Sequence, residues 1–320
     1  MYASFKSIGA YIPEEIRGND WFISRMDTTD EWITKRTGIS QRRIASKEQN
    51  TSDLGVNASL LAIKRSDIEV GDIDLIVCAT ISPDYYCMPS TACLIAEKLG
   101  IKDVMALDIS AACTGFVYAL SVAKAFIESG MKKNVLIIGA EKLSNIVDYT
   151  DRTTCMLFGD GAGAAIISAT TNKDEAILDI NCSADGSQKD LLLTPGIQSG
   201  EATFMQMKGN ETFKIAVRTL TKDVEMILAR NNQTQDDIDL FIPHQANFRI
   251  IKAVGDALKF DDDKKVLTVH KYGNTSSASI PMAINDCYES GRLKTGHNML
   301  LDAFGGGLTW GSAIVKFCGK

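Results

Sequence analysis

The chain alternates short apolar runs with longer stretches in which apolar residues recur every three or four positions. The apolar runs, each predicting a buried β-strand, are Leu75–Ala79, Val135–Ile138, Ala164–Ile167, Phe241–Ile242, Met299–Leu301 and Ala313–Phe317. Residues 115–130 have helical spacing and end at a glycine, which predicts an amphipathic helix. This alternation indicates a layered α/β architecture in which helices cover the sheets.

The same order of elements occurs twice along the chain. Asp72-Ile-Asp-Leu-Ile returns as Asp237-Ile-Asp-Leu-Phe, and Asn134-Val-Leu-Ile-Ile returns as Asn298-Met-Leu-Leu-Asp, at offsets of 165 and 164 residues. Three ordered matches, counting Glu128-Ser-Gly and Glu289-Ser-Gly, favour a duplication over chance. We therefore predict two similar halves, residues 1–170 and 171–320, packed as one body because no Pro/Ser-rich linker separates them.

Composition narrows the class of protein. The 320 residues are 45% hydrophobic and 23% charged, as in ordinary globular proteins, and the net charge of −6 argues against a nucleic-acid partner. No apolar run approaches the roughly 20 residues of a membrane span. The first residues lack a signal-peptide pattern and the eight cysteines lack metal-ligand spacing, so we expect reduced thiols, no metal and a cytoplasmic location.

Three predicted junctions between strand or turn and helix carry side chains suited to catalysis. Cys113 lies where the predicted strand 104–109 gives way to the helix at 115–130. A helix start offers unpaired N–H groups and the positive end of the helix dipole, so we expect a lowered thiol pKa and a nucleophilic thiolate. A buried, inert cysteine is the plainer alternative for this residue taken alone.

His244 and Asn274 occupy the other two junctions. His244, one of only three histidines, follows the strand at 241–242, where strand ends in α/β sheets present side chains to a crevice. Asn274 lies in a polar turn that opens a helix ending at Gly291, and the duplication aligns this turn with that of Cys113. A core histidine and a turn asparagine are the plain alternatives, but three matching junctions favour one shared site.

Two glycine-rich stretches differ in meaning. Residues 158–163 fit a dinucleotide-binding pattern only superficially, because the glycines lead into the β-branched run at 164–167; we predict a turn feeding a strand. Gly305-Gly-Gly307 can instead bring backbone N–H groups close to a ligand, which suits an oxyanion hole shared with the Cys113 N–H. A simple tight turn is the alternative.

Taken together, these motifs resemble those of the thiolase-like condensing enzymes, and most closely the β-ketoacyl-acyl carrier protein synthase III group. The resemblance spans essentially the whole chain. The motifs are Thr28-Thr-Asp-Glu-Trp32-Ile-Thr-Lys-Arg36-Thr-Gly-Ile, Ala112-Cys113-Thr-Gly-Phe, Asp151-Arg152-Thr-Thr, Met207-Lys-Gly209-Asn-Glu-Thr-Phe213-Lys214, Pro243-His244-Gln-Ala-Asn247, Gly273-Asn274-Thr-Ser and Gly305-Gly-Gly-Leu-Thr-Trp310-Gly.

The resemblance implies a duplicated thiolase-like fold with five layers, αβαβα, and a homodimer. It also implies the initiating condensing enzyme of type II fatty acid synthesis. In that reaction an acyl-CoA primer, expected to be acetyl-CoA, acylates Cys113, and the acyl group then condenses with decarboxylating malonyl-acyl carrier protein. His244 and Asn274 would stabilise the enolate, and the N–H groups of Cys113 and Gly306 would form the oxyanion hole. Elongating relatives carry a second histidine in place of Asn274. Coenzyme A enters as a substrate thioester, and no resident cofactor is expected.

A coenzyme A site is implied at the start of the chain. The pattern Thr28-x-x-Glu31 predicts a capping box and a helix running to about Gly38. Trp32 and Arg36 are four residues apart on one face of this helix, where an indole can stack on adenine and a guanidinium can meet phosphates. An ordinary surface helix is the alternative. The resemblance adds Arg152 to this clamp and Gly209, Phe213 and Asn247 to the pantetheine channel.

Two further sets of residues are implied. Met88, which would approach across the dimer interface, and Phe304 are assigned to the acyl pocket, where the flexible methionine leaves primer length and branching open. A basic rim in this acidic chain would steer the acidic acyl carrier protein; its residues are Lys214, Arg249, Lys252 and Lys259. Lys252 and Lys259 are one heptad apart, which predicts one helix face, although solvated lysines are the alternative.

Two other functions stay open from the sequence. The same residues would serve a sibling condensing enzyme of secondary metabolism with another primer or acceptor. A cysteine hydrolase or a non-catalytic acyl-binding scaffold is the alternative from a different class. The position of the cysteine within a duplicated α/β half and the triple-glycine loop argue against the hydrolase and the scaffold.

Overall fold

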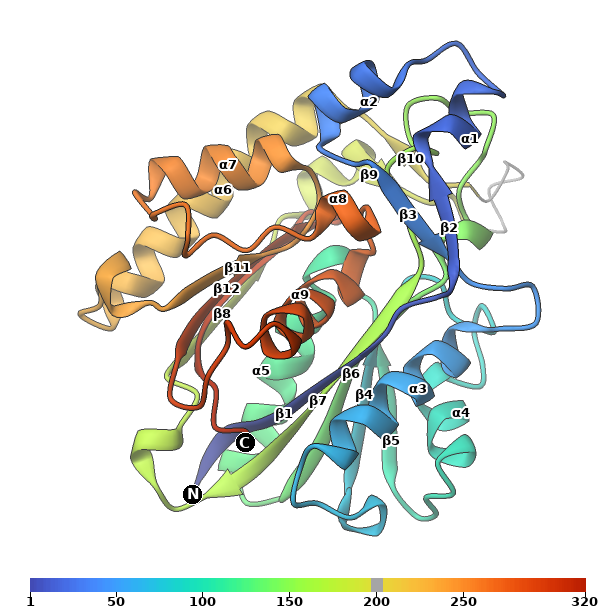
Figure 1. Ribbon diagram of the computed structural model, residues 1–320. Helices are drawn as coiled ribbons and strands as arrows, with labels where there is room; N and C mark the ends of the chain where they lie inside the picture. Colours follow the sequence, from blue (N-terminus) through green and yellow to red (C-terminus); the bar gives the residue numbers. More distant parts are fainter. Residues whose placement is uncertain (197–203) are drawn as a thin grey trace.

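Two stacked β-sheets form the core of the computed structural model, which describes residues 1–196 and 204–320 (Figure 1). The first sheet has the order β1-β7-β6-β4-β5. Its strands are β1 (Tyr2–Tyr11), β4 (Leu75–Ala79), β5 (Met105–Ile109), β6 (Asn134–Glu141) and β7 (Gly161–Thr170). The second sheet, of order β11-β12-β13-β8, contains β8 (Asp179–Ala184), β11 (Leu240–Pro243), β12 (Asn298–Gly305) and β13 (Thr309–Lys316).

The two sheets repeat one topology, which confirms the predicted duplication. β4 runs parallel to β6, β6 antiparallel to β7, and β7 antiparallel to β1; β11, β12, β13 and β8 pair in the same way. The counterpart of β5 is reduced to a single parallel bridge between Phe241 and Lys265. Side-chain bonds repeat too, since Asp74 accepts from the Asn134 N–H at 3.2 Å and Asp239 from the Asn298 N–H at 2.7 Å.

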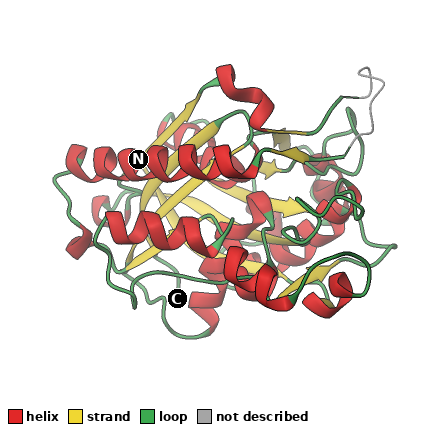
Figure 2. Ribbon diagram, turned by 90° about the horizontal axis from the view of Figure 1, so that it is seen from above, coloured by secondary structure: helices red, strands yellow, loops and turns green. Residues whose placement is uncertain are grey.

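Helices cover and separate the sheets in five layers, αβαβα (Figures 1 and 2). α3 (Thr51–Lys64) and α4 (Thr91–Lys98) pack on the outer face of the first sheet. α5 (Gly115–Glu128) and α9 (Ser279–Glu289) fill the space between the sheets and share one apolar core with both. α6 (Gly209–Arg230) and α7 (Phe248–Ala257) cover the second sheet. The predicted fold class is therefore confirmed.

Smaller elements lie at the end of the molecule toward which β5 and β11 run (Figure 1). They are α1 (Asn19–Ile23), α2 (Asp30–Thr37), α8 (Val269–Tyr272) and the strand pairs β2 (Glu15–Gly18) with β3 (Gln41–Ile44) and β9 (Leu192–Leu193) with β10 (Gln206–Met207). The fully buried Arg42 ties them together by donating to Asn19 Oδ1 at 2.7 Å and, through Nε, to the Met156 carbonyl at 2.9 Å.

The elements agree with the pattern of apolar positions. All six predicted strands coincide largely with observed ones, and the helix predicted at 115–130 is α5. The turn at 158–160 feeds β7, as predicted. The strands of the first sheet all precede residue 171 and those of the second follow it, while the boundary between the halves stays a prediction. None of the described helices is long and apolar enough to cross a lipid bilayer.

Candidate active site

Cys113 lies in a short 3-10 helix, η2 (Ala112–Thr114), between β5 and α5. Ala112 has a left-handed backbone with φ of 47°, which is uncommon for a residue other than glycine. The aligned 3-10 helix η8 (Ser276–Ala278), at the start of α9, begins with Ser276 at φ of 48°. The two junctions that the duplication relates therefore share a backbone conformation as well as a position.

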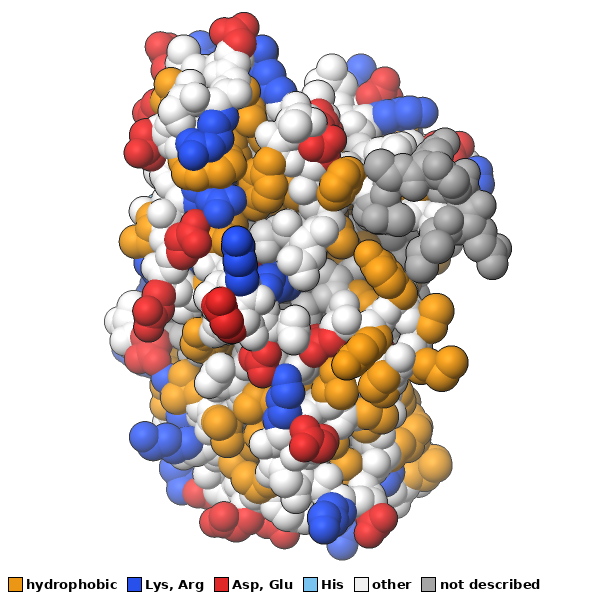
Figure 3. Space-filling view, turned by 90° about the vertical axis from the view of Figure 1, so that its right-hand side faces the viewer, with side chains coloured by type: hydrophobic (Ala, Val, Ile, Leu, Met, Phe, Trp, Pro, Cys, Tyr) orange, Lys and Arg blue, Asp and Glu red, His pale blue; other side chains and the backbone are white. Residues whose placement is uncertain are grey.

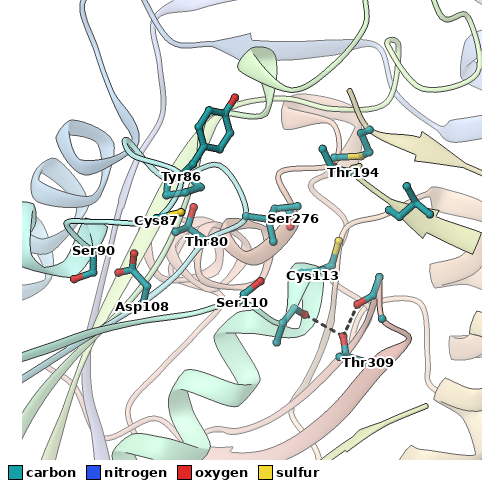
Figure 4. Close-up of a pocket in the computed structure, with 18 of the residues that line it drawn as sticks. Thr80, Tyr86, Cys87, Ser90, Asp108, Ser110, Cys113, Thr194, Ser276 and Thr309 are labelled. Atoms are coloured by element: carbon teal, nitrogen blue, oxygen red, sulfur yellow. Dashed lines mark hydrogen bonds between the residues drawn. The ribbon is translucent and has the colours of Figure 1, made fainter. Parts of the chain in front are cut away.

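Two cavities meet at Cys113. The larger, about 880 Å³, is lined by the loops that follow β4 and β5 and by Gly306 (Figure 4). The smaller, about 620 Å³, extends toward α2, α6 and α7. Both are lined by Cys113, Phe158 and Leu192. A ligand in either cavity can therefore reach the same sulfur.

The smaller cavity brings together Cys113, His244 and Asn274. His244 follows β11, and its Nδ1 is 2.6 Å from Ser279 Oγ, so Nε2 is the ring nitrogen left for a ligand. The Asn274 Oδ1 accepts from the Ser276 N–H at 2.8 Å, which leaves the Nδ2 group to donate. The arrangement offers a nucleophile and two hydrogen-bond donors to one small molecule.

Burial controls the protonation of Cys113 and His244. It raises the pKa of the Cys113 thiol to about 12 and lowers the pKa of His244 to about 3, so both groups are uncharged at neutral pH. The expectation of a lowered thiol pKa is therefore wrong, because desolvation outweighs the helix start. A neutral imidazole can still donate through Nε2 when the Ser279 hydroxyl donates to Nδ1.

The triple-glycine loop lies against the nucleophile. A Cβ on Gly305 would stand 2.7 Å from the Cys113 nitrogen, so only glycine permits this approach. Gly306 lines the larger cavity beside Cys113. The Thr309 hydroxyl lies 3.0 Å from the Ala111 carbonyl oxygen and thereby joins the loop to η2 (Figure 4). This placement suits the expected oxyanion hole.

The helix that carries Trp32 starts one residue later than the capping box predicts. Thr29, not Thr28, is the N-cap, and its side chain accepts from the Trp32 N–H at 3.1 Å. Thr28 is buried, with its hydroxyl 3.9 Å from Met156 Sδ, and it lines neither of the two cavities that meet at Cys113. The left-handed Gly38 ends the helix, as predicted.

The expected coenzyme A residues gather at the outer end of the smaller cavity. The guanidinium carbons of Arg36 and Arg152 lie 4.2 Å and 4.7 Å from the centre of the Trp32 ring. The Asn247 side chain donates to the Arg36 carbonyl at 3.0 Å. A hollow of about 650 Å³ adjoins this mouth and is lined by Thr29, Glu31, Trp32, Lys35, Arg36 and Arg249. The smaller cavity is also lined by Gly209, Phe213 and Asn247.

Of the two residues assigned to the acyl pocket, only Phe304 can be compared with the cavity linings of one chain, because Met88 is expected to act across a dimer interface. Phe304 lines the smaller cavity, together with His244, and does not line the larger cavity. Met88 is 81% exposed, and only its neighbours Cys87 and Pro89 line the larger cavity. Phe304 belongs to β12, and the cavity that its side chain lines depends on tertiary packing that local sequence does not encode.

The basic rim is only partly as expected. Lys214 and Arg249 lie at the mouth of the smaller cavity, and the Arg249 guanidinium stands 5.2 Å from the Phe213 ring centre. Lys252 forms an ion pair with Asp256 at 2.8 Å. Lys259 lies beyond α7, with a left-handed φ of 61°, so the prediction that it shares a helix face with Lys252 is wrong.

Three residues of the site were missed. Ser279 contacts His244, Ser276 lies beside Cys113, and the buried Glu141 accepts hydrogen bonds from Ser277. Serines in a turn are common, and Glu141 ends an apolar strand, so none carries a signal in the sequence. Only the duplication, which aligns 274–277 with the Cys113 junction, points to this segment.

Known proteins with similar sequences and structures fit this site. Models of the family described as 3-oxoacyl-[acyl-carrier-protein] synthase III match residues 107–186, and those of its C-terminal part match residues 228–317. The β-ketoacyl-[acyl-carrier-protein] synthase III of Sulfurimonas denitrificans is 67% identical over 99% of this chain and 98% of its own, and that of Sulfurovum is 65% identical over 100% and 97%. The crystal structure of the Aquifex aeolicus 3-oxoacyl-[acyl-carrier-protein] synthase III has a TM-score of 0.94 and 42% identity, covering 98% of this chain and 100% of that one. The chain belongs to the 3-oxoacyl-[acyl-carrier-protein] synthase III family.

Proposed function

We propose that the chain is the initiating condensing enzyme of type II fatty acid synthesis. It transfers the acyl group of an acyl-CoA primer, acetyl-CoA, to Cys113 and condenses it with malonyl-acyl carrier protein. The observation that carries this proposal is the smaller cavity, which connects Cys113, His244 and Asn274 to the clamp around Trp32. Coenzyme A takes part as a substrate thioester, and the proposal assigns no resident cofactor.

In the first half-reaction, the Cys113 sulfur attacks the thioester carbonyl, and coenzyme A leaves. The tetrahedral oxygen receives hydrogen bonds from the N–H groups of Cys113 and Gly306; the support for this assignment is that both residues line the larger cavity and that Gly305 lies against the Cys113 nitrogen. A cysteine suits this step because its sulfur is a soft nucleophile toward a thioester. The product is an acyl-enzyme.

In the second half-reaction, malonyl-acyl carrier protein enters the smaller cavity and loses CO₂. The enolate oxygen accepts from His244 Nε2 and Asn274 Nδ2, the two groups that their other contacts leave free. The enolate carbon then attacks the acyl carbonyl on Cys113 and expels the sulfur. A carboxylate at position 274 would offer no donor, which explains the amide.

The Trp32 clamp predicts a split between binding and chemistry. Trp32→Ala is expected to lower kcat/KM for acetyl-CoA, because it removes a stacking contact worth about 1–3 kcal/mol. Acetyl-pantetheine, which lacks the nucleotide, should react almost normally with the variant. The measurement is the ratio of kcat/KM for the two donors in both proteins. Equal slowing of both donors would make Trp32 a structural residue and refute the clamp.

Lys214 and Arg249, exposed at the cavity mouth, suit docking of an acidic carrier protein. Lys214→Ala is expected to raise KM for malonyl-acyl carrier protein about two- to fivefold, with a weaker salt dependence, because rim charges act mainly on encounter. Steady-state kinetics at low and high salt measure this. The matched control is Lys173→Ala, an exposed lysine between β7 and β8. Equal effects of the two substitutions would exclude this docking site.

The proposal includes a cytoplasmic homodimer. β5 is an edge strand of the first sheet in the described residues, and the nearby Tyr85, Tyr86 and Met88 are 55%, 71% and 81% exposed. Figure 3 shows apolar side chains gathered over part of the face that lies to the right of Figure 1. An open edge and exposed apolar residues favour pairing with a second copy. Met88 would then reach the partner's acyl pocket, which leaves primer length to be measured.

A second candidate function has one observation in its favour. The priming β-ketosynthase of the R1128 polyketide biosynthetic pathway is 31% identical, with a TM-score of 0.95 over 99% of this chain and 97% of that one. Mass analysis of the carrier-bound product after incubation with malonyl-acyl carrier protein and a panel of acyl-CoA primers separates the two functions. Our proposal predicts acetoacetyl-acyl carrier protein from acetyl-CoA. Products only from longer primers would favour the second function, and no condensation product would refute both.

A further inference from the structure

The imidazole ring of His244 is held in place by one side chain. Ser279, the buried first residue of α9, has its Oγ 2.6 Å from His244 Nδ1. Among the described residues, no other group forms a hydrogen bond to this ring. His244 is buried too, and it lines the smaller cavity with Cys113 and Asn274. The orientation of the ring in that cavity therefore depends on Ser279.

The contacts of Ser279 determine where its hydroxyl proton points. Oγ accepts from the backbone N–H of Gln245 at 3.4 Å, and His244 Nδ1 is the one acceptor that the described part of the chain offers to the hydroxyl. A hydroxyl carries a single proton, and a ring nitrogen that accepts it must itself be unprotonated. The neutral imidazole then carries its own proton on Nε2.

The backbone around His244 is anchored independently of this contact. The buried side chain of Gln245 makes four hydrogen bonds to backbone groups. Its partners are the carbonyls of Pro243 and Val266, at 2.8 and 3.1 Å, and the N–H groups of Thr268 and Val269, at 2.7 and 3.1 Å. The His244 N–H donates to the Asp302 carbonyl at 2.7 Å. With the backbone fixed in this way, Ser279 is left to control the rotation and the tautomer of the ring.

The partner of Nδ1 is a hydroxyl and not a carboxylate, which limits what the ring can do. Among the described residues, no carboxylate forms an ion pair with His244. Burial lowers the pKa of His244 to about 3. A carboxylate at Nδ1 would favour the charged imidazolium, whereas a hydroxyl leaves the ring neutral. The ring is therefore suited to donate a hydrogen bond from Nε2 without taking up a proton.

The duplication shows that the fold does not require this polar contact. Gly115 and Ser279 are the first residues of α5 and α9, each directly after one of the paired 3-10 helices. The offset of 165 residues places Ala79 opposite His244. These positions also meet in the first half, where a Cβ on Gly115 would stand 2.8 Å from the Ala79 Cβ. The first half thus has a small apolar contact at the place where the second half has the hydrogen-bonded pair, and this pair lies at the cavity.

We propose that Ser279 is a positioning residue that donates to His244 Nδ1 and holds the imidazole as the tautomer with its proton on Nε2. This inference rests on the role proposed above for His244, donation to the enolate in the second half-reaction. Without the hydroxyl, the proton can move to Nδ1 or the ring can rotate. A lone pair on Nε2 would then face the enolate oxygen and repel it. Acylation of Cys113 does not use this donor.

The tautomer can be observed directly by NMR of protein labelled with ¹⁵N in its histidine rings. The chain has three histidines, so the spectrum is simple, and His244→Ala identifies the signals of His244. The protonated and unprotonated nitrogens of a neutral imidazole resonate in separate regions. We expect Nε2 of His244 to be protonated and Nδ1 to be unprotonated at neutral pH. A proton on Nδ1 in the wild-type protein would overturn the proposal.

Ser279→Ala tests whether the tautomer matters for the reaction. Decarboxylation of malonyl-acyl carrier protein should fall about 10- to 100-fold in kcat, as is typical when a group that orients a functional histidine is removed. Its KM and the rate of acylation by acetyl-CoA should stay near the wild-type values. The His244 signals should shift toward a mixture of tautomers. Ser279→Thr keeps the hydroxyl and should retain both the wild-type signals and decarboxylation.

The matched control is Ser59→Ala in α3. Ser59 is a buried helical serine whose hydroxyl donates to the Gly55 carbonyl at 2.7 Å, remote from both cavities that meet at Cys113. This variant should decarboxylate at the wild-type rate and leave the His244 signals unchanged.

The outcomes separate this inference from a structural role and from the proposed function. Wild-type decarboxylation in Ser279→Ala, or a loss of decarboxylation with unchanged His244 signals, would overturn the positioning role. Should Ser279→Ala fail to fold, the wild-type spectrum and Ser279→Thr decide. Failure of the wild-type protein to decarboxylate malonyl-acyl carrier protein would refute the proposed function, while the spectrum would still report on the hydrogen bond.

Discussion

Cys113→Ala is expected to abolish acylation of the chain by acetyl-CoA. Among the described residues, Cys113 carries the only sulfur at which both cavities meet, so the variant leaves the acyl group no acceptor in reach of the oxyanion donors. Loss of a nucleophile that works with other groups typically costs at least about 10⁴-fold in rate. Intact-protein mass spectrometry should show one acetyl unit on the wild-type protein and none on the variant.

Cys87 supplies the matched control for this experiment. It is an exposed cysteine that lines the larger cavity, yet it does not line the smaller cavity that carries His244 and Asn274. Cys87→Ala should acylate at the wild-type rate. An acetyl adduct that persists in Cys113→Ala and disappears in Cys87→Ala would move the nucleophile to Cys87.

Asn274→Ala is expected to impair decarboxylation of malonyl-acyl carrier protein far more than acylation. The Nδ2 donor is needed once the enolate carries negative charge, and losing one such donor typically costs about 2.7–4 kcal/mol, or 10²- to 10³-fold in kcat. Acylation of Cys113 does not use this donor and should change little. Release of CO₂ and formation of the acetyl-enzyme are measured separately.

Asn274→Asp shows whether chemistry or structure is lost. The aspartate keeps an oxygen that can accept from the Ser276 N–H, as Asn274 does at 2.8 Å, but it has no N–H to donate. We expect it to decarboxylate as poorly as Asn274→Ala. His244→Ala should also lose decarboxylation. Equal losses in both half-reactions for the Asn274 variants would contradict the assigned division of labour.

Much of the fold is predictable from the chain because it depends on repeated local patterns. The apolar runs locate the strands, and the paired segments at 72–76 and 237–241 give the duplication. The reduced fifth strand of the second sheet is not among the predicted strands: Lys265 contributes only one bridge there, although the apolar Val266 and Leu267 follow it. The shift of the helix start from Thr28 to Thr29 likewise follows from tertiary packing, which buries Thr28 against Met156.

The candidate site is likewise predictable where it depends on local sequence and not where it depends on tertiary packing. Cys113, His244 and Asn274 stand at junctions that local sequence identifies, and the structure places all three on one cavity. Their protonation cannot be predicted in this way, because the burial that sets it comes from the packing of the two halves. The cavity that Phe304 lines depends on tertiary packing around β12, and the role expected of Met88 depends on a second copy of the chain. The serines beside the nucleophile have no distinctive pattern at all.

The most direct test of the central claim follows one acyl group through both half-reactions. The protein is acylated with isotopically labelled acetyl-CoA, freed of excess donor and mixed with unlabelled malonyl-acyl carrier protein. The account predicts that the label leaves Cys113 and appears in acetoacetyl-acyl carrier protein, with one CO₂ released for each product. Label that stays on the protein, or that is released as free acetate, would contradict a condensing enzyme with Cys113 as its nucleophile.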